Sequence, residues 1–319
     1  MTSRTASPPL ASATTADASA TAAAQSAVLV ADDGRHLAAS WVEPPTGAAY
    51  AVAVISAAAG VPRGYYRAFA NWLAGRGYAV LSYDYRGIAG SRSAGPLRTE
   101  AATMRDWAVL DMSAALAAAE ARRGGRGLPL LLVGHSFGGN SIGFARGVER
   151  ADAILTVASQ IGEARLFPGV HRVVGETFFR AWLPAVVALC GHAPGWALGG
   201  AAQPLPAGVA RQWSAWGLRR GWAFSDPAMR PFSSYGAIVA PVHLWNISDD
   251  LSYAPPKAVD ALATQFRNAV VQRHTLTPAA VAMRKLGHFG AFRREPGPRA
   301  WAPMLAAIET AVPALRPRP

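Results

Sequence analysis

The sequence predicts an α/β protein with a mostly parallel, doubly wound sheet and an antiparallel hairpin at its N-terminal edge. Short apolar runs typical of buried strands alternate with helical stretches along most of the 319 residues. Asp33-Gly34, a good hairpin turn, separates two strand-like segments near the beginning of the chain. Further along, Leu130–Val133 runs directly into the glycine-rich turn Gly134–Gly138.

Each expected element has a local justification in apolar periodicity and in flanking turn residues. Strands are expected at Ala27–Ala31, His36–Val42, Ala51–Ser56, Tyr78–Tyr83, Leu130–Val133, Ala153–Ala158, Val242–Ile247 and Val270–Leu276. Helices are expected at Tyr66–Arg76, Thr99–Arg122, Pro256–Phe266 and Trp301–Val312, with a further helical stretch from Asn140 towards Arg146.

Composition divides the chain into three kinds of segment. Residues 1–26 are a low-complexity tail rich in Ala, Ser and Thr, which we expect to be disordered. Residues 27–159 and 237–315 carry the strand-helix alternation of the core. Residues 160–236 break that rhythm with tryptophan, phenylalanine, proline and glycine, and are predicted to form an inserted cap. Its aromatic side chains are expected both to form a small core and to line a pocket.

Charge and cysteine content exclude several classes of protein. The formal net charge is +12, but it comes from scattered arginines without a basic helix, so we expect no nucleic-acid partner. The single cysteine, Cys190, rules out an internal disulfide framework. The tail lacks a signal-peptide core, and Pro184 interrupts an apolar stretch that is too short to cross a bilayer. These features predict a cytoplasmic protein without an integral membrane segment; they do not indicate its oligomeric state.

Ser136 is the candidate nucleophile. It lies in Gly134–Gly138, a G-x-S-x-G pattern that follows a buried strand and precedes a helical stretch. A serine at such a sharp turn has a strained backbone, and glycines two residues before and after it let strand and helix approach each other. The turn also leaves the Phe137 N–H at the start of a helix, where it could stabilise an oxyanion.

His288 is the candidate general base. A serine hydroxyl is a poor nucleophile at neutral pH unless an imidazole takes its proton. Of seven histidines, His288 alone lies in a glycine-flanked loop after the last strand and before the last helix. Loops at the carboxyl ends of strands are where such folds place their chemistry.

An aspartate after the strand Val242–Ile247 is the candidate third member. Asp249 and Asp250 both follow this strand, and either carboxylate could hold the second imidazole nitrogen of His288. Counting nine residues on from Pro241 favours Asp250. Glu163, which follows the preceding strand, is a less favoured candidate.

These motifs identify a resemblance to the α/β-hydrolase superfamily over roughly residues 27–315. The chain resembles in particular a group of bacterial predicted hydrolases of the serine esterase and aminopeptidase type. The resemblance rests on Ser56–Pro62 with Tyr65-Tyr66, Tyr83–Gly87 with Gly90-Ser91, Gly134–Gly139, Asp249-Asp250 and Gly287–Gly290. It implies a Ser–acid–His triad, hydrolysis through an acyl-enzyme, and a cap inserted at 160–236.

The sequence departs from the pattern of many relatives at one place. Where they carry His-Gly after the third strand, this chain has Ser56-Ala57. Because the second oxyanion donor is a backbone N–H, the hole can persist, and we expect Ala58 to supply that donor together with Phe137. Asp84 and Arg86 are expected to form an ion-paired turn that braces the active-site loops.

The sequence therefore predicts a serine hydrolase of the esterase type, acting on a carboxylic ester, thioester or amide. The predicted triad is Ser136, Asp250 and His288, with no metal or organic cofactor. The expected partner is a small acyl substrate with an apolar group. Two alternatives remain open: an acyltransferase that uses the same triad, and a non-catalytic binding protein with this fold.

Overall fold

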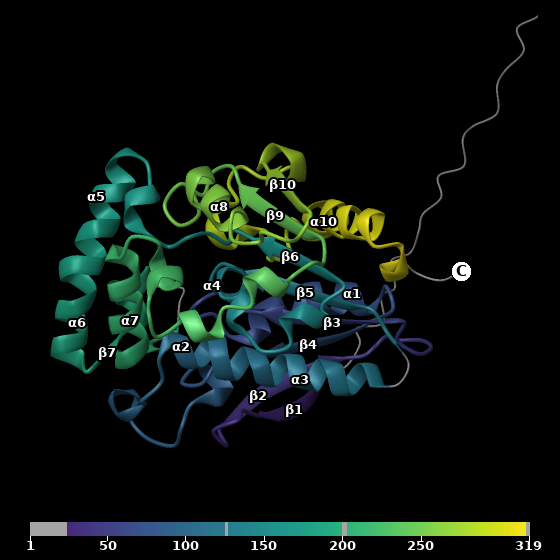
Figure 1. Ribbon diagram of the computed structural model, residues 1–319, viewed down its shortest axis with the longest axis horizontal. Coiled ribbons are helices and arrows are strands. Elements are labelled where there is room, and N and C mark those ends of the chain that lie inside the picture. The colour runs from purple at the N-terminus through teal and green to yellow at the C-terminus, as the bar shows by residue number, and fades with distance from the viewer. Residues whose placement is uncertain (1–23, 125–126, 200–202, 317–319) are drawn as a thin grey trace, which may run out of the picture.

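The structure, a computed structural model, describes residues 24–124, 127–199 and 203–316. Within these residues eight strands form one sheet in the order β1-β2-β4-β3-β5-β6-β9-β10 (Figure 1). The strands are β1 Ala24–Val30, β2 His36–Val42, β3 Ala51–Ser56, β4 Tyr78–Tyr83, β5 Leu130–His135, β6 Ala153–Val157, β9 Val242–Ile247 and β10 Val271–Leu276.

The sheet has the predicted mixture of parallel and antiparallel pairs. β1 pairs antiparallel with β2, and β2 pairs antiparallel with β4. Every pair from β4 through β10 is parallel. The central strands β3, β4, β5 and β6 are buried along their whole length, which explains their continuous apolar sequences. The predicted fold class is confirmed.

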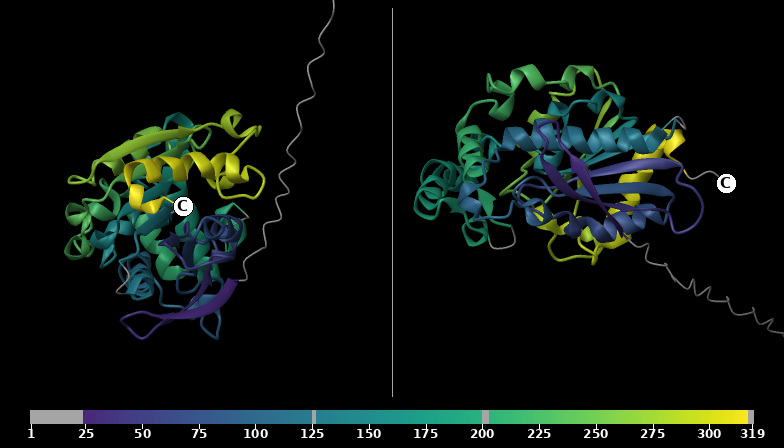
Figure 2. Two further views of the ribbon diagram at one scale, coloured as in Figure 1. Left: turned by 90° about the vertical axis from the view of Figure 1, so that its right-hand side faces the viewer. Right: turned by 90° about the horizontal axis from the view of Figure 1, so that it is seen from below.

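Helices cover both faces of this sheet. α1 and α10 pack against each other and against the sheet, while α3 packs on β3 from the opposite side (Figure 2, right panel). The helices of the core are α1 Arg67–Ala74, α2 Met104–Asp106, α3 Met112–Arg123, α4 Phe137–Asn140, α8 Pro256–Ala263, α9 Gly287–Gly290 and α10 Gly297–Ala311.

Some element boundaries differ from the sequence prediction. β1 begins at Ala24, inside the predicted 1–26 tail; the rest of that tail lies outside the described residues. The helix expected from Thr99 begins only at Met104, because Thr103 and Asp106 form a capping box at that point. The Asp106 N–H donates to the Thr103 hydroxyl at 3.2 Å, and the Thr103 N–H donates to the Asp106 carboxylate at 2.9 Å.

The described residues of the segment predicted as a cap contain three α-helices, which lie at one end of the molecule (Figures 1 and 2). These are α5 Gly169–Thr177, α6 Leu183–Cys190 and α7 Ala207–Leu218, with a small antiparallel pair β7 His192–Ala193 and β8 Leu205–Pro206. A turn of π-helix joins α5 to α6, so one helical stretch runs from Gly169 to Cys190. The exact domain boundaries stay a prediction.

This joined stretch bears on the membrane prediction. By length and composition these 22 residues could cross a bilayer, since an 18-residue window within them has a mean hydropathy of 1.5, although Pro184 lies in the stretch. Its inner side chains Phe179, Leu183 and Val187 are buried and α6 packs against α7, as in a helix of a folded domain.

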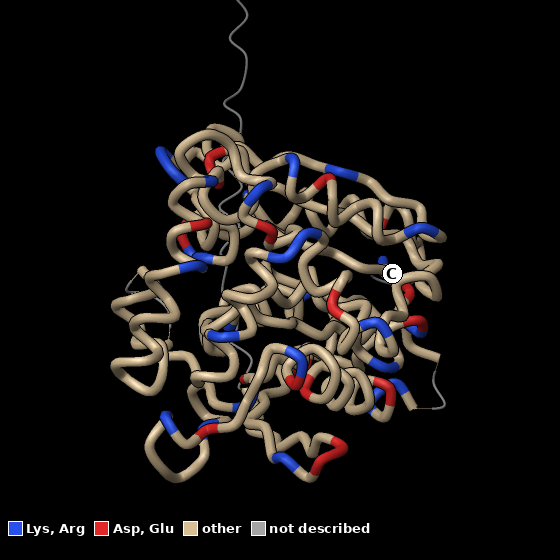
Figure 3. The backbone as a smooth tube through the Cα atoms, turned by 60° about the vertical axis from the view of Figure 1, so that its left-hand side comes forward, with Lys and Arg blue, Asp and Glu red and all other residues tan. Residues whose placement is uncertain are grey.

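Arginines and lysines are distributed among acidic residues over the backbone and do not form one continuous stripe (Figure 3).

Two histidines pair across the parallel strands β9 and β10. His243 Nδ1 lies 3.0 Å from His274 Nε2, and the two rings are nearly parallel. His243 is fully buried, and its Nε2 has no hydrogen-bond partner among the described residues. Burial lowers the pKa of His243 to about 4 and also lowers the pKa of His274. Both rings are therefore neutral at pH 7.

This pair predicts a loss of stability in acid. Below pH 6.5 the unfolded chain protonates His243, whereas the folded chain does so only near pH 4, so the free energy of unfolding falls as pH drops through that window. When the pH is lowered from 7 to 4.5, the free energy of unfolding should fall by about 2 kcal/mol less in His243→Leu than in the parent protein. Urea unfolding at both pH values measures this; equal losses in the two proteins would contradict it.

Candidate active site

Ser136 lies at a sharp turn between β5 and α4. Its backbone has φ +52° and ψ −117°, a conformation that costs a non-glycine residue free energy and persists only where packing enforces it. A Cβ on Gly138 would lie 2.0 Å from the Ser56 carbonyl oxygen, and one on Gly134 would lie 2.3 Å from the Gly139 Cα. Side chains at these positions are therefore excluded, as the sequence pattern predicts.

The helix after Ser136 is shorter than predicted. α4 ends at Asn140, and a short 3₁₀ turn over Ile142–Phe144 replaces the helical stretch expected towards Arg146. Glycines at 138, 139 and 143 disfavour a longer helix. The Tyr235 ring packs so closely on Gly143 that a Cβ there would lie 2.4 Å from it. Tyr235 also donates its hydroxyl to the Asn140 carbonyl at 2.8 Å, which fixes the end of the helix.

His288 and Asp250 form a buried pair beside this turn. Nδ1 of His288 lies 2.5 Å from Oδ2 of Asp250, and the two residues are 6% and 2% exposed. Because a carboxylate can only accept, Nδ1 carries the proton and Nε2 is the free basic nitrogen. The ring of Tyr253 stacks on His288 at 4.7 Å and shields one face of the imidazole from water.

Asp249 has a different set of contacts from Asp250. Its two carboxylate oxygens accept the N–H groups of Leu286 and Gly287, both at 2.9 Å. Asp249 thereby holds the loop that carries His288, whereas Asp250 contacts the imidazole itself. Glu163 accepts the Gly221 N–H at 2.8 Å and lies near Arg165, so it ties the inserted segment together. The geometry favours Asp250 as the partner of His288.

A buried chain of hydrogen bonds links the loop after β3 to the His288 loop. The Ala58 N–H donates to the Tyr66 hydroxyl at 2.9 Å, and that hydroxyl lies 2.7 Å from His135 Nδ1. His135 Nε2 in turn lies 3.0 Å from the His288 carbonyl oxygen. Since that carbonyl only accepts, His135 carries its proton on Nε2 and accepts the Tyr66 proton on Nδ1.

Electrostatics supports this assignment of protons. Burial lowers the pKa of His135 well below its ordinary value and raises the pKa of Tyr66. Both side chains therefore stay neutral. The Tyr66 hydroxyl and the His135 imidazole each donate one hydrogen bond and accept one. Sequence reasoning missed this role for both residues. The signal available was a tyrosine shortly after the oxyanion loop and a histidine immediately before the serine.

The two predicted oxyanion donors, the N–H groups of Phe137 and Ala58, differ in the acceptors available to them. Phe137 begins α4, and the first N–H groups of a helix have no acceptor within their own helix. Ala58 lies at the predicted position after β3, but its N–H is already bonded to Tyr66. An oxyanion bound at this point would have to draw that N–H away from the tyrosine. The pairing of Ala58 with Phe137 therefore stays a prediction.

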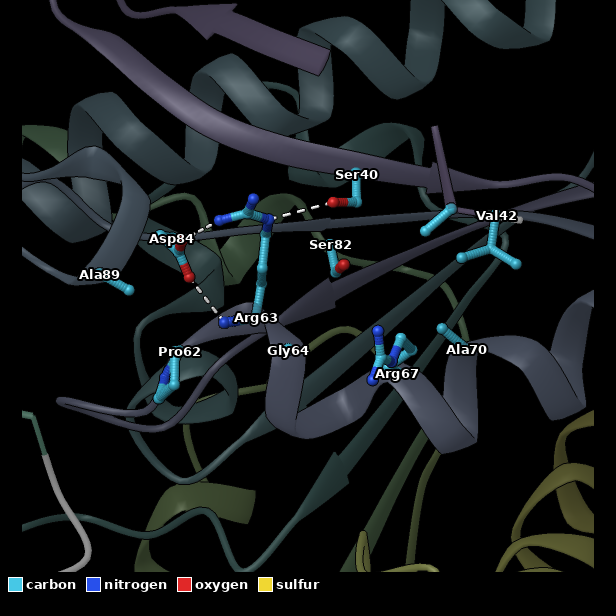
Figure 4. A pocket seen from close by; sticks show the side chains of 11 residues that line it. Ser40, Val42, Pro62, Arg63, Gly64, Arg67, Ala70, Ser82, Asp84 and Ala89 are labelled. Atoms are coloured by element: carbon cyan, nitrogen blue, oxygen red, sulfur yellow. Dashed lines mark hydrogen bonds and ion pairs between the residues drawn. The ribbon is translucent and has the colours of Figure 1, made fainter. Parts of the chain in front are cut away.

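Asp84 and Arg86 brace the surrounding loops through separate partners. Asp84 pairs with the Arg63 guanidinium and accepts the Arg63 N–H at 2.6 Å (Figure 4). Arg86 bonds to the buried Asp111 at 2.7 Å and to Asp33 at 2.5 Å. The two residues of this turn are thus ion-paired, as expected, but not with each other.

A cavity of about 280 Å³ lies beside the Arg63–Asp84 pair (Figure 4). Its lining includes the serines Ser40 and Ser82 but not Ser136, Asp250 or His288. Ser136 is itself only 9% exposed. Ser136, Asp250 and His288 are thus all nearly buried, and among the described residues a hydrogen bond joins His288 to Asp250 but not to Ser136. Among the described residues no group of three or more histidine, cysteine, aspartate or glutamate side chains could hold a metal ion.

The aromatic residues of the inserted segment divide into two sets. Trp216 and Trp222 are fully buried against each other at 5.2 Å and seat the segment on the core. Phe178, Phe179 and Trp213 form a second cluster between the π-helical turn after α5 and helix α7. Trp182 and Trp196 are instead 46% and 63% exposed. The segment therefore has its own small core, as predicted, and also presents aromatic rings to solvent.

Comparison with solved structures identifies this fold. A soluble variant of monoglyceride lipase from Saccharomyces cerevisiae has a TM-score of 0.61 and 13% identity, covering 92% of this chain and 96% of that chain. An esterase from Pyrococcus furiosus has a TM-score of 0.55 and 13% identity, with 91% and 92% covered. A puromycin-hydrolyzing peptidase from Mycobacterium tuberculosis has a TM-score of 0.54 and 18% identity; the match covers 92% of this chain and 39% of the peptidase.

The chain has the α/β-hydrolase fold, and part of it is similar to one family of serine peptidases. A family model described as serine aminopeptidase, S33, matches residues 50–186, which include the loop after β3, the Ser136 turn and the beginning of the inserted segment. No curated protein sequence matches the chain.

Removing the Tyr66 hydroxyl tests the buried chain of hydrogen bonds. Tyr66→Phe leaves the Ala58 N–H and His135 Nδ1 buried without partners, which should lower the free energy of unfolding by about 2 kcal/mol. Tyr50→Phe is the matched control, because Tyr78 still donates to the Leu315 carbonyl that Tyr50 contacts. This control should lower the free energy of unfolding by less than about 1 kcal/mol, with both variants measured by urea titration. Equal losses in the two variants would show that the Tyr66 hydrogen bonds add no extra stability.

Proposed function

We propose that the protein is a serine hydrolase that cleaves carboxylic esters, or related thioesters or amides, through an acyl-enzyme. The observation that carries this proposal is the buried 2.5 Å contact between His288 and Asp250, in a loop that is bonded to the residue before a serine in a strained turn. His135, adjacent to Ser136 in the chain, also bonds to the His288 carbonyl, so the two loops are directly connected. A structural role alone does not require a solvent-shielded imidazole with a free nitrogen at this place.

In the first half of the proposed reaction, Ser136 Oγ attacks the acyl carbon while His288 Nε2 takes the hydroxyl proton. Asp250 holds the proton on Nδ1 and stabilises the imidazolium that forms. The carbonyl oxygen becomes an oxyanion, which accepts the Phe137 N–H and draws the Ala58 N–H away from Tyr66. His288 then protonates the leaving group, and the bond between acyl carbon and leaving group breaks.

In the second half, water attacks the acyl-enzyme and His288 takes its proton. Collapse of the tetrahedral intermediate returns that proton to Ser136 and releases a carboxylic acid. Since Ser136 and His288 are nearly buried, we infer that the segment 160–236 acts as a cap and moves to admit substrate. The neighbouring aromatic side chains favour an apolar group on that substrate.

Reaction with a fluorophosphonate probe tests the nucleophile. The probe should form one covalent adduct, located at Ser136 by mass spectrometry of the digested protein, because only an activated serine reacts at neutral pH. Ser136→Ala should abolish labelling. Ser141→Ala is the control, since this buried serine lies in the next turn and its hydroxyl donates to Asn140. An unlabelled parent protein, or labelling that survives loss of Ser136, would refute the proposal.

Replacement of each aspartate separately tests the acid. Asp250→Asn should lower kcat for p-nitrophenyl esters by about 10⁴-fold with little change in KM, because the imidazole loses its correct tautomer. Asp249→Asn keeps one acceptor for the Leu286 and Gly287 N–H groups, so it should lower stability and affect kcat far less. Activity that survives Asp250→Asn but not Asp249→Asn would reverse the assignment.

A further inference from the structure

The helical stretch Gly169–Cys190 presents apolar side chains to solvent along its whole length. Val173 is 63% exposed and Leu189 is 86% exposed, and other apolar or small residues recur between them at helical spacing. The exposed residues of this stretch are Gly169, Val170, Arg172, Val173, Val174, Thr177, Arg180, Ala181, Trp182, Pro184, Ala185, Ala188, Leu189 and Cys190, most of them apolar or small. The opposite face packs inward through Phe179, Leu183 and Val187. A surface helix of a monomeric domain normally places polar residues on its outer face.

The charges that flank this outer face are mainly positive. Arg165, Arg172 and Arg180 are the basic residues between 164 and 190, and Glu176 is the only acidic residue there. Glu176 is already paired with Arg172 at 2.8 Å. Glu163, directly before this range, lies 3.7 Å from Arg165, so Arg180 is the one arginine of the three without an ion pair among the described residues. A second copy of the chain on this face would bring two Arg180 side chains to the same interface without an added acidic partner, which disfavours a dimer.

Two tryptophans mark the edge of the same surface. Trp182 and Trp196 contact each other edge to face with their ring centres 6.1 Å apart, and both are exposed. The Trp182 indole N–H donates to the Ala197 carbonyl at 3.1 Å, so its polar group is satisfied while its ring remains outside. Such amphipathic rings are typical of the boundary between water and a lipid headgroup layer. Trp182 also lines a shallow groove of about 320 Å³, together with Val173, Val174 and Phe178.

The surface adjoins the loop that carries Asp250. His171 at the start of α5 lies 3.1 Å from the hydroxyl of Ser252, two residues after Asp250. Leu251 and Tyr253 in that loop are 41% and 38% exposed, and Tyr253 stacks on His288. Exposed apolar side chains thus lead from the outer helix face towards the site.

We propose that the outer face of Gly169–Cys190 is a docking surface for an anionic lipid layer. The apolar stripe and the groove enter the boundary between headgroups and acyl chains, the two tryptophans lie at the headgroup level, and Arg180 contacts lipid phosphates. The helix lies on the membrane rather than crossing it, because its inner face is occupied by the packing against α7. This surface does not depend on Ser136 being a nucleophile.

Vesicle co-sedimentation of the full chain tests the proposal. Ser136→Ala serves as the parent protein, so that any hydrolysis of lipid is avoided. We expect it to pellet with vesicles of equimolar phosphatidylcholine and phosphatidylglycerol, to bind pure phosphatidylcholine more weakly, and to lose affinity as salt rises. Absence of binding to the mixed vesicles, or equal binding to both kinds, would overturn the proposal.

Matched surface variants locate the contact. Val173→Asp should weaken vesicle binding about tenfold or more, because it places a charge in the apolar stripe. Val28→Asp is its control, since Val28 is equally exposed, at 65%, but lies on β1. Arg180→Gln should weaken binding about fivefold, whereas Arg92→Gln, another exposed arginine, should not. Equal effects of Val173→Asp and Val28→Asp would refute the assigned surface.

Light scattering after gel filtration distinguishes the other occupant of this face. A monomeric parent protein supports the lipid surface. A dimer that Val173→Asp converts to monomer, without binding of either form to vesicles, would show that the face is an interface between two copies and would overturn the proposal. The melting temperatures of Val173→Asp and Val28→Asp should match that of the parent protein, since both side chains are exposed.

Discussion

The close approach of the turn around Ser136 to strand β3 is the constraint on which the rest of the site depends. Gly138 lies against the Ser56 carbonyl so tightly that no Cβ fits between them. This contact holds the serine backbone at a positive φ and aligns the start of α4 with the loop after β3. The glycine pattern is therefore a packing requirement, and the position of Ser136 follows from it.

Hydrogen bonds then connect three loops that are far apart in the sequence. Tyr66 joins the loop after β3 to His135, and His135 joins the Ser136 turn to the His288 loop. Asp249 holds the same loop from the β9 side, while Asp250 binds the imidazole. Each donor and acceptor in this series of hydrogen bonds has a single feasible proton assignment. The hydrogen bonds therefore fix the relative positions of the three loops. In the proposed reaction, Ala58 is the point where this fixed network and the oxyanion compete for one N–H group.

Some features of the fold and of the candidate site could be predicted from the sequence, and others could not, for physical reasons. Buried parallel strands such as β3 and β5 are continuously apolar, so their positions could be read directly, and the Ser136 turn followed from its glycines. Adjacent aspartates point in different directions at the end of β9, which local pattern cannot resolve. The Tyr66–His135 contact joins residues 69 positions apart and leaves no periodic signal. The sequence also does not show which face of Gly169–Cys190 is exposed, because both sides of that helix are apolar.

A crystal structure of the protein after reaction with a fluorophosphonate would test the central claim most directly, because the phosphonyl group mimics the tetrahedral intermediate. We expect phosphorus bonded to Ser136 Oγ, a phosphoryl oxygen within hydrogen-bond distance of the Phe137 N–H, and the contact between His288 and Asp250 intact. The Ala58 N–H should have turned from Tyr66 to the phosphoryl oxygen. Phosphorus on another residue, or a phosphoryl oxygen directed away from Phe137, would contradict the proposed role of Ser136.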